Sequence, residues 1–590
     1  MGDAQRCAYP AAMLRPLLVA LCLLTALSAQ GAPTRNTLLV IADDVGVDSI
    51  ACYGLGSNPP PTPTIDALAA GGVRFANAQA CPVCSPTRSS LLTGRHGFRT
   101  GIGAAVANAA NGLAASEVLL PEILAPAGVQ TALFGKWHLG SDLGPLTPTA
   151  EGFGTFTGAL GGALMSYTQW QKVENGVAGP TTNYATTDVV DEALAYVAGT
   201  SQPWFVVLSF HAGHSPHHAP PAALHSQNLG GLSPATTPFP FYRAMVEAMD
   251  RELGRFLATI PAATRANTNV VFLGDNGTAS DVVQAPFDPA RSKGTVYQGG
   301  VRVPLIVQGP AVQGGPRVEG ALVHAVDLFA TIATLHGVNA RAAVPAAVPL
   351  DAIDAAPLLA AANQQAPRAI SYTQEFAGAV AMTAAGDSEM ARDGRFSLLR
   401  FVRPTLTIRE ELYDLSVDPF ETTDLLLQPL SATAATAYRA LSREVARLRG
   451  LPWSAQYGTG CSGAGLAPAL QVVAGSVPQP GATFTLRITS LSLAAPVSVV
   501  AVGFSDATWA GVPLPFDLGA IGMTGCTLWT DPVITSVVAT IAASVTAPIA
   551  LPNDPSIVGA GFFAQAFPLA PSANPAGILA TNAVAALVGN

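Results

Sequence analysis

Charged side chains are scarce in this chain of 590 residues, because Asp, Glu, Lys and Arg together make up only 11% of it. Basic residues are outnumbered by acidic ones, and the net charge at pH 7 is -9. A protein that binds a phosphate backbone needs a basic surface, so we exclude nucleic acid as a partner. The sequence also lacks an internal repeat, and its length suffices for about two to four domains.

Apolar runs that suit a membrane-spanning helix are lacking as well. Near the N-terminus, Arg15 precedes an apolar run over residues 17–27 that is too short for a bilayer, and small residues follow it. Basic, apolar and small segments in this order are typical of a secretory signal. We therefore predict a signal peptide at residues 1–32 and a secreted or periplasmic protein, with an uncleaved anchor as the alternative.

A second uncharged run, VITSVVATIAASVTAPIALP from Val533, is long enough to cross a bilayer. It is rich in β-branched residues, it contains several Ser and Thr, and no basic residues flank it, so we interpret it as two strands. We expect no membrane span once the signal is removed.

Cysteines are few, and five remain after export: Cys52, Cys81, Cys84, Cys461 and Cys526. Disulfides form in an oxidising compartment, and the odd number leaves at least one thiol unpaired. We expect Cys461 and Cys526 to pair in a separate C-terminal region. Cys52 and Cys81 could pair as well, in which case Cys84 is the odd one.

Short apolar runs alternate with helix-like segments from residue 37 to about residue 315. NTLLVIADD, PWFVVLSFHAGHSP and NVVFLGDNG are typical of buried strands, whereas FYRAMVEAMDRELGRFLATI is an amphipathic helix. This alternation predicts an α/β domain whose largely parallel sheet has helices on both faces. Ligands bind at the carboxyl ends of such strands. The polar segments 43–44, 211–214 and 275–276 all follow apolar strands, so we expect them to meet at one sheet edge.

The rest of the chain has a different pattern. We assign residues 33–365 to the catalytic α/β domain, and residues 366–455, with antiparallel-type strands such as RFSLLRFV and a closing helix, to a small α+β subdomain of the same unit. Residues 459–590 are rich in Gly, Pro and Ala and carry short alternating strands. They are predicted to form an appended β-sandwich.

Four polar residues after the strands offer oxygen ligands: Asp43, Asp44, Asp275 and Asn276. Three carboxylates and one amide oxygen suit a hard divalent cation, Ca²⁺ or Mg²⁺, rather than zinc. Acids at strand ends more commonly form turns or caps, so neither pair is specific alone. Asn276 also begins a glycosylation sequon, which a metal ligand could not use.

Five basic residues form a second set: Arg88, Lys136, His138, His214 and Lys293. Cations beside a divalent ion suit an anion with several oxygens, either a sulfate or a phosphate. Each residue alone has a simpler explanation as a surface lysine, a satisfied histidine or a solvated arginine.

The stretch CPVCSPTRSSLLTGRH, which begins at Cys81, allows two chemistries. Ser85 and Pro86 can open a helix, which would place Cys84 at its positive end, where a developing anion is stabilised. The same position would lower a thiol pKa and suit a redox pair with Cys81. The local sequence leaves both interpretations open.

The segment from Cys84 to Arg95, with CSPTR followed by LTGR, resembles the signature of the type I sulfatases, C-x-P-x-R and then TGR. The motifs DDVG, TPTIDALAAGGVRF, GKWHLG, GDNG and KGTVYQGGVRVP occur in the order of that family, and the likeness covers about residues 35–450. The resemblance implies an alkaline-phosphatase-like α/β fold with a mixed, mainly parallel sheet between helices.

The resemblance also implies a modified nucleophile. In that family a separate formylglycine-generating enzyme converts the motif cysteine, here Cys84, to formylglycine, whose hydrate attacks sulfur. One divalent cation, Ca²⁺ or alternatively Mg²⁺, would be held by residue 84 with the four oxygen-bearing residues above. Cys81 would then be an incidental neighbour or the disulfide partner of Cys52.

The remaining roles follow from the same resemblance. Arg88 would steady the hydrate, and Lys136, His138 and Lys293 would contact the sulfate. His214 would protonate the leaving oxygen. Gln298 departs from the pattern, because relatives often carry Glu there.

We therefore predict a secreted, arylsulfatase-like hydrolase of sulfate esters, acting on a sulfated small molecule or glycan. Three alternatives remain: a phosphatase or phosphonate monoester hydrolase of the same fold, a catalytically silent glycan-binding relative with an intact thiol at Cys84, and a redox protein that uses Cys81 and Cys84.

Overall fold

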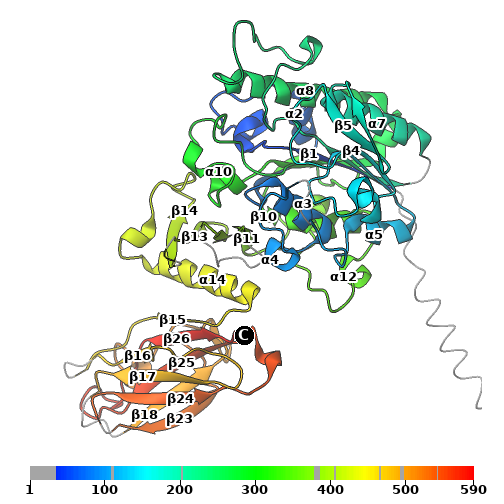
Figure 1. Ribbon diagram of the computed structural model, residues 1–590. Helices are drawn as coiled ribbons and strands as arrows, with labels where there is room; N and C mark the ends of the chain where they lie inside the picture. The colour runs from blue at the N-terminus through cyan, green and yellow to red at the C-terminus, as the bar shows by residue number, and fades with distance from the viewer. Residues whose placement is uncertain are drawn as a thin grey trace, which may run out of the picture. The chain divides into compact units, whose positions relative to one another are not determined.

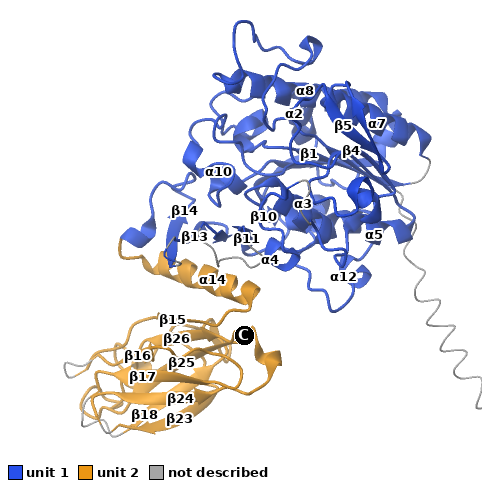
Figure 2. Cartoon of the chain, viewed as in Figure 1, with its two compact units in different colours: residues 1–427 blue, residues 428–590 orange. Residues whose placement is uncertain are grey.

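The computed structural model of the protein describes residues 35–590 except 108–111, 201–202, 378–385, 404, 406, 464–466, 492–496 and 541 (Figure 1). The chain forms two compact units, residues 1–427 and residues 428–590 (Figure 2). The signal peptide expected at residues 1–32 lies outside the described residues.

A ten-stranded sheet forms the centre of the first unit, in the order β10-β2-β9-β8-β1-β7-β3-β4-β5-β6. The strands β8, β1, β7, β3 and β4 pair in parallel, as do β10 and β2. In contrast, β9, β5 and β6 are antiparallel to their neighbours. This arrangement confirms the expected α/β fold. In sheet order the strands span Arg317–His324, Val73–Gln79, Leu305–Gln308, Thr268–Gly274, Asn36–Ala42, Trp204–Ser209, Gln130–Lys136, Thr155–Ala159, Trp170–Glu174 and Val177–Thr181.

Helices cover both faces of this sheet, because its central strands are apolar on both sides. Every residue of β1, β7 and β8 is buried. Leu38 and Val40 of β1 belong to one core, which includes α2, α7 and α8, and Leu39 and Ile41 belong to the other, which includes α3, α5 and α11. These helices span Pro63–Ala70, Ala185–Gly199, Pro238–Thr259, Cys84–Thr93, Leu120–Leu124 and Leu328–Leu335.

The register of the central strands brings their carboxyl ends level with one another. Ala42 of β1 lies opposite Gly274 of β8, Ile41 lies opposite Ser209 of β7, and Ser209 lies opposite Gly135 of β3. The residues that follow these four adjacent strands therefore emerge side by side at one edge of the sheet, as expected from the sequence.

A smaller antiparallel sheet completes the first unit. Its strand order is β11-β12-β13-β14. The strands span Ser371–Glu375, Ser388–Arg392, Phe396–Val402 and Ile408–Asp414.

The second unit contains the helix α14 (Ala432–Arg449) and two larger antiparallel sheets. Phe484 of one sheet and Phe562 of the other pack in a shared core, as in a sandwich. The structure thus places α14 and β15 in this unit, upstream of the boundary expected at residue 459. One sheet has the order β15-β26-β25-β18-β23, and its strands span, in that order, Trp453–Tyr457, Ala583–Leu587, Gly561–Pro568, Val497–Gly503 and Ile534–Ala539. The other has the order β16-β17-β24, and its strands span Ala469–Val472, Thr483–Thr489 and Val545–Ala550.

The uncharged run that begins at Val533 forms the two strands β23 and β24, which confirms the prediction from its composition. Among the helices of the described residues, none combines the length and the apolar character needed to cross a membrane.

Candidate active site

Four oxygen-bearing side chains lie together where β1 and β8 end. Asp43 and Asp44 follow β1 directly, and Asp275 and Asn276 follow β8. Asn276 Nδ2 donates to Asp44 Oδ1 at 2.8 Å, and the Asp44 backbone N–H donates to Asp275 Oδ1 at 3.2 Å. All four residues are buried. The structure therefore brings together the four residues that the sequence singled out as oxygen ligands.

This cluster fits a hard divalent cation. Within the part of the chain that the structure describes, Asp43 Oδ1 and Asn276 Oδ1 are buried without a hydrogen-bond partner. Buried oxygens normally have a partner, and carboxylate and amide oxygens are the ligands that Ca²⁺ and Mg²⁺ prefer. Ligand atoms of Asp43, Cys84 and Asp275 also lie within 4.8 Å of one another. The donor set and its two unpartnered oxygens are therefore suited to such an ion.

Two residues of the site adopt the left-handed backbone conformation, which residues other than glycine rarely adopt. Asp44 has φ of 59° and His138 has φ of 62°, a conformation that costs about 1–3 kcal/mol per residue. A hydroxyl group holds each of them. Tyr242 donates to the Asp44 carbonyl at 3.0 Å, and Ser85 donates to the His138 carbonyl at 2.8 Å. The surrounding fold thus fixes the direction of both side chains.

Cys84 is the first residue of α3, as the sequence predicted, and its Sγ lies 3.2 Å from His138 Nδ1. His138 Nε2 faces the Val106 carbonyl at 3.0 Å. A carbonyl only accepts, so Nε2 carries the proton and Nδ1 presents its lone pair to residue 84. Burial lowers the pKa of His138 to about 2, with the charges of Lys136 and Arg88 acting in the same direction, so the ring is neutral.

Arg88 is fully buried and joins the ends of three strands. It donates from Nε and Nη2 to Asp275 Oδ2 at 3.2 and 2.8 Å, and from Nη1 to Ser209 Oγ at 2.6 Å and the Lys136 carbonyl at 3.1 Å. Burial, with the neighbouring Asp43 carboxylate, raises the pKa of Asp275 to about 6 although Arg88 opposes the shift. Arg88 thus places positive charge near residue 84.

Two lysines complete the ring of cations. Lys136 Nζ donates to Asp43 Oδ2 at 2.6 Å, and Lys293 Nζ lies 2.5 and 2.7 Å from the two carboxylate oxygens of Asp44. Burial alone would raise the pKa of Asp43, but Lys136, His214 and the other cations outweigh it and hold that pKa far below its usual value. The Asp43 carboxylate is therefore ionised.

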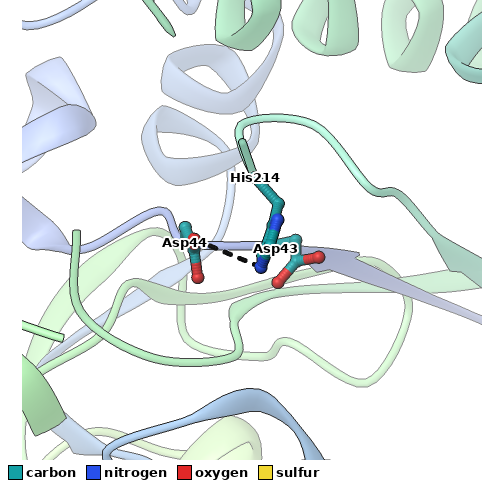
Figure 3. Close-up of side chains that lie close together, drawn as sticks. All are labelled: Asp43, Asp44 and His214. Atoms are coloured by element: carbon teal, nitrogen blue, oxygen red, sulfur yellow. Dashed lines mark ion pairs between the residues drawn. The ribbon is translucent and has the colours of Figure 1, made fainter. Parts of the chain in front are cut away.

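His214 lies close to Asp43 and Asp44 (Figure 3). Its Nε2 lies 3.9 Å from Asp44 Oδ2, and its Nδ1 lies 2.7 Å from the Ser215 carbonyl, so Nδ1 carries a proton. Tyr167 fixes the turn that carries His214. Its hydroxyl lies 2.6 Å from the His211 carbonyl and 2.8 Å from the His214 carbonyl.

All ten predicted site residues therefore lie in one cluster, but sequence reasoning missed several residues that position them. Ser209, Ser85, Tyr242 and Tyr167 contact the cluster through hydroxyl groups. Ser209 had a readable signal, because it is the polar residue that ends the apolar strand WFVVLS. The other three contact backbone carbonyls far away in sequence, for which the sequence gives no pattern.

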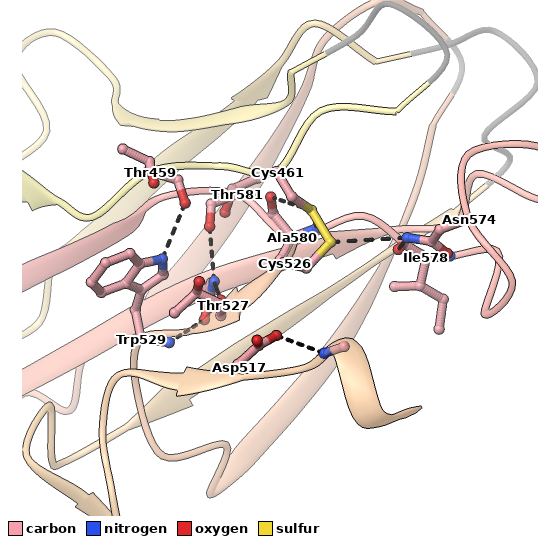
Figure 4. The surroundings of a disulfide bond; sticks show 12 residues. Thr459, Cys461, Asp517, Cys526, Thr527, Trp529, Asn574, Ile578, Ala580 and Thr581 are labelled. Atoms are coloured by element: carbon pink, nitrogen blue, oxygen red, sulfur yellow. Dashed lines mark hydrogen bonds between the residues drawn. A yellow bond between two sulfur atoms is a disulfide. The ribbon is translucent and has the colours of Figure 1, made fainter. Parts of the chain in front are cut away.

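The C-terminal cysteines pair as expected. Cys461 and Cys526 form a disulfide within the second unit (Figure 4). Asn574 Nδ2 lies 3.9 Å from Cys526 Sγ and also donates a hydrogen bond to the Ile578 carbonyl.

The suggested pairing of Cys52 with Cys81 is wrong, because both are free thiols. Cys52 precedes β2 and lies near Asp66, whereas Cys81 follows β2. Cys81 Sγ instead lies 3.9 Å from Ser90 Oγ. Cys84 is also free.

The redox alternative loses support from the surroundings of the same thiols. Burial raises the pKa of Cys81 to about 11 and raises the pKa of Cys84 as well. Thiols used in disulfide exchange have lowered pKa values. Cys81 and Cys84 therefore lack the lowered thiol pKa that a redox pair uses.

Two of the known proteins with similar sequences are arylsulfatases. Human (Homo sapiens) arylsulfatase A is 28% identical over 527 residues, which cover 78% of this chain and 97% of that protein. Mouse (Mus musculus) arylsulfatase J is 28% identical over 324 residues, which cover 52% of this chain and 53% of that protein. The chain thus spans about half the length of this second relative.

A solved structure supports the fold assignment. The crystal structure of Ps i-CgsB in complex with k-i-k-neocarrahexaose superposes with a TM-score of 0.60 at 23% identity, over 70% of this chain and 93% of that one.

The family model for sulfatases matches residues 35–338, which contain all the site residues described above. The chain belongs to the sulfatase family, within the alkaline-phosphatase-like superfamily.

Proposed function

We propose that this protein is a secreted or periplasmic hydrolase of sulfate esters. The observation that carries the proposal is the placement of four cationic or polar nitrogen groups around residue 84. Lys136, Lys293 and Arg88 each pair with a carboxylate of the cluster, and His138 contacts Cys84 directly. Such a ring suits an anion with several oxygens that is held beside the nucleophile.

Two groups would complete the site. Asp43, Asp44, Asp275, Asn276 and residue 84 would hold one divalent cation, which we infer to be Ca²⁺, with Mg²⁺ as the alternative; it would stabilise charge that develops on the sulfate oxygens. Cys84, converted to formylglycine by a separate enzyme, would supply a hydrated aldehyde with one hydroxyl for attack on sulfur and a second for release of sulfate.

The protein's own residues prepare the first step. Arg88 donates two hydrogen bonds to Oδ2 of Asp275 and thereby fixes the orientation of that carboxylate. In this orientation Asp275 would accept the proton of the attacking hydroxyl. Lys136 and Lys293 bring two fixed positive charges to the sulfate position. Because they are already in place and largely buried, little reorganisation is needed when charge grows in the transition state.

The leaving alcohol needs a proton, and His214 is placed to give it. Its Nδ1–H is fixed on the Ser215 carbonyl, so the proton for the leaving oxygen would come from Nε2, which faces the cluster. In the second step, the Nδ1 lone pair of His138 faces residue 84 and would accept a proton from the remaining hydroxyl.

The substrate would be a sulfated small molecule or glycan. The carbohydrate option is supported by the ligand in the similar Ps i-CgsB structure, and the aryl option by the relationship to arylsulfatase A. Phosphatases of this superfamily commonly use two zinc ions, whereas the oxygen-rich donors of this cluster suit one hard cation beside several basic residues. This donor set favours sulfate over phosphate.

The test compares kcat/KM for phenyl sulfate and phenyl phosphate, esters of the same alcohol, using protein made in a host that forms formylglycine. We expect the sulfate ester to be preferred by at least about 100-fold, because removing or mismatching one preorganised interaction already costs about that much. The Cys84→Ala variant is the control for contaminating hydrolases. Preference for the phosphate ester would contradict the proposal.

A further inference from the structure

An apolar cavity lies beside the active site and has no part in the chemistry described so far. Its volume is about 780 Å³, within the range of cavities that bind small molecules. The chain that connects β4 to β5 forms one wall, and the β5–β6 hairpin forms another. Its lining includes Leu160, Leu164, Met165, Trp170, Val173 and Pro180.

One end of the cavity, at Ala159 and Leu160, lies at the same sheet edge as the active site. β4 lies next to β3 in parallel, so Ala159 at the end of β4 is level with Lys136 at the end of β3. Directly beyond these ends, the His138 backbone N–H donates to the Leu160 carbonyl at 3.0 Å. Gly162 packs so closely on the His138 ring that a Cβ there would lie 2.2 Å from it. The wall of the cavity therefore rests on a residue that contacts Cys84.

The far end of the same wall reaches the other side of the active site. Tyr167, two residues beyond Met165, holds the carbonyls of His211 and His214. The Ala185 backbone N–H donates to the Tyr167 carbonyl at 2.8 Å. One connection thus contacts both the nucleophile side and the leaving-group side while its apolar residues line the cavity. The cavity is therefore built from the same connection that contacts residues on both sides of the active site.

The chemistry of the lining selects an apolar occupant. Among the described residues that line the cavity, none is charged, and most are aliphatic or aromatic. Met165 is 90% exposed although it is apolar and flexible, a property of surfaces that accommodate variable hydrophobic ligands. A polysulfated chain would find no basic partner here, whereas a hydrocarbon group would lose water contact at no electrostatic cost.

We propose that this cavity binds the hydrocarbon part of the alcohol whose sulfate ester the active site cleaves. The substrate would thus be the sulfate of an extended apolar alcohol, such as an alkylphenol or a fused-ring compound. This inference rests on the sulfatase function proposed above, which supplies the anchored sulfate at one end of the molecule.

The first test is a series of 4-n-alkylphenyl sulfates from methyl to hexyl. The para-alkyl group barely changes the acidity of the phenol, so the chemical step is matched across the series. We expect kcat/KM to rise with each methylene, by up to about fourfold for a fully buried one, until the cavity is filled. Equal values from methyl to hexyl would overturn the proposal.

A pair of variants locates the effect. Ala178 lines the cavity from β6 and is exposed, so Ala178→Glu places a charge in the cavity without disturbing a buried core. The preceding residue, Val177, is 73% exposed. Because successive side chains of a strand point to opposite faces, Val177 points to the face of the sheet away from that of Ala178. Ala178→Glu should abolish the rise with chain length, whereas Val177→Glu should keep it. A rise that survives in Ala178→Glu would show that the alkyl group binds elsewhere.

A binding measurement separates failure of this inference from failure of the sulfatase function. 4-Hexylphenol carries no sulfate, and its binding to the wild type and to Ala178→Glu can be followed by calorimetry. Binding by the wild type that is lost in the variant supports the cavity even if no ester is hydrolysed, and the proposed function alone would then fail. Hydrolysis of phenyl sulfate without binding of 4-hexylphenol would overturn the cavity proposal alone.

Discussion

The ammonium group of Lys136 lies 2.6 Å from Asp43 Oδ2, and both side chains are fully buried. The two residues come from the ends of β3 and β1, which are separated in the sheet only by β7. A buried ion pair of this kind contributes little net stability, but removing one partner leaves an uncompensated charge. Its place at the catalytic edge indicates a role in positioning charge.

Replacement of this lysine should affect activity and stability together. We expect Lys136→Met to lower kcat/KM for phenyl sulfate by at least about 100-fold, because a preorganised cation is lost. The free energy of unfolding should fall by about 3 kcal/mol, because Asp43 loses its buried partner. Lys172→Met is the matched control, since Lys172 is also buried and bonded to Asp188 but lies away from the cluster. It should lose stability and keep its turnover; the same loss of turnover in both variants would contradict the account.

The hydroxyl of Tyr167 should matter for difficult leaving groups. Tyr167→Phe removes the two contacts that hold the turn of His214, so proton donation becomes less well aligned. We expect kcat/KM to fall about 10- to 100-fold for sulfates of weakly acidic alcohols, and to change little for 4-nitrophenyl sulfate, whose leaving group needs no proton. The control is Tyr184→Phe, because the Tyr184 hydroxyl contacts His218 and not this turn. Equal losses for both ester types would indicate a merely structural role.

Removal of divalent cations should lower both activity and thermal stability. Without a cation, the carboxylates at the end of β1 and β8 repel one another, and Asp43 Oδ1 and Asn276 Oδ1 remain buried without a partner. Restoring Ca²⁺ at about 100 times its Kd should return roughly 2.7 kcal/mol of stability. Tm with chelator and with added Ca²⁺ or Mg²⁺ measures this. In Asp43→Asn the cation-dependent rise in Tm should be much smaller, and a Tm that ignores the chelator in the wild type would contradict the site.

The disulfide should stabilise the second unit without affecting catalysis. Cys461 and Cys526 are 65 residues apart, and closing a loop of that length stabilises the folded state by about 4 kcal/mol in the chain-entropy description. We expect the Cys461→Ser, Cys526→Ser double variant to unfold this unit at lower denaturant concentration. All the described site residues lie in the first unit, so kcat/KM for phenyl sulfate should be unchanged. Loss of activity would show that the second unit takes part in function.

The sequence allowed the fold and the cluster to be predicted because both depend on local patterns. Buried strands such as NTLLVIA are apolar without alternation, and the polar residues directly after them had to emerge at the carboxyl edge of a parallel sheet. The helix that begins at Cys84 follows from Pro86 near its start.

Other features depend on long-range packing and could not be read in this way. Cys52 and Cys81 are free thiols, and cysteine counting could not show this because it carries no information on distance. The roles of Tyr167 and Tyr242 arise from bonds to backbone carbonyls, which any residue supplies. The assignment of α14 to the second unit likewise reflects contacts rather than composition.

The chemical state of residue 84 is the most direct test of the account. Trypsin releases residues 75–88, FANAQACPVCSPTR, and this peptide contains both Cys81 and Cys84. The protein would be purified from its native host, denatured, alkylated with iodoacetamide and analysed by mass spectrometry. We expect one alkylated cysteine, at Cys81, and a mass at residue 84 that matches an aldehyde or its hydrate. A peptide with two alkylated cysteines would contradict the proposed nucleophile and favour a catalytically silent, glycan-binding relative.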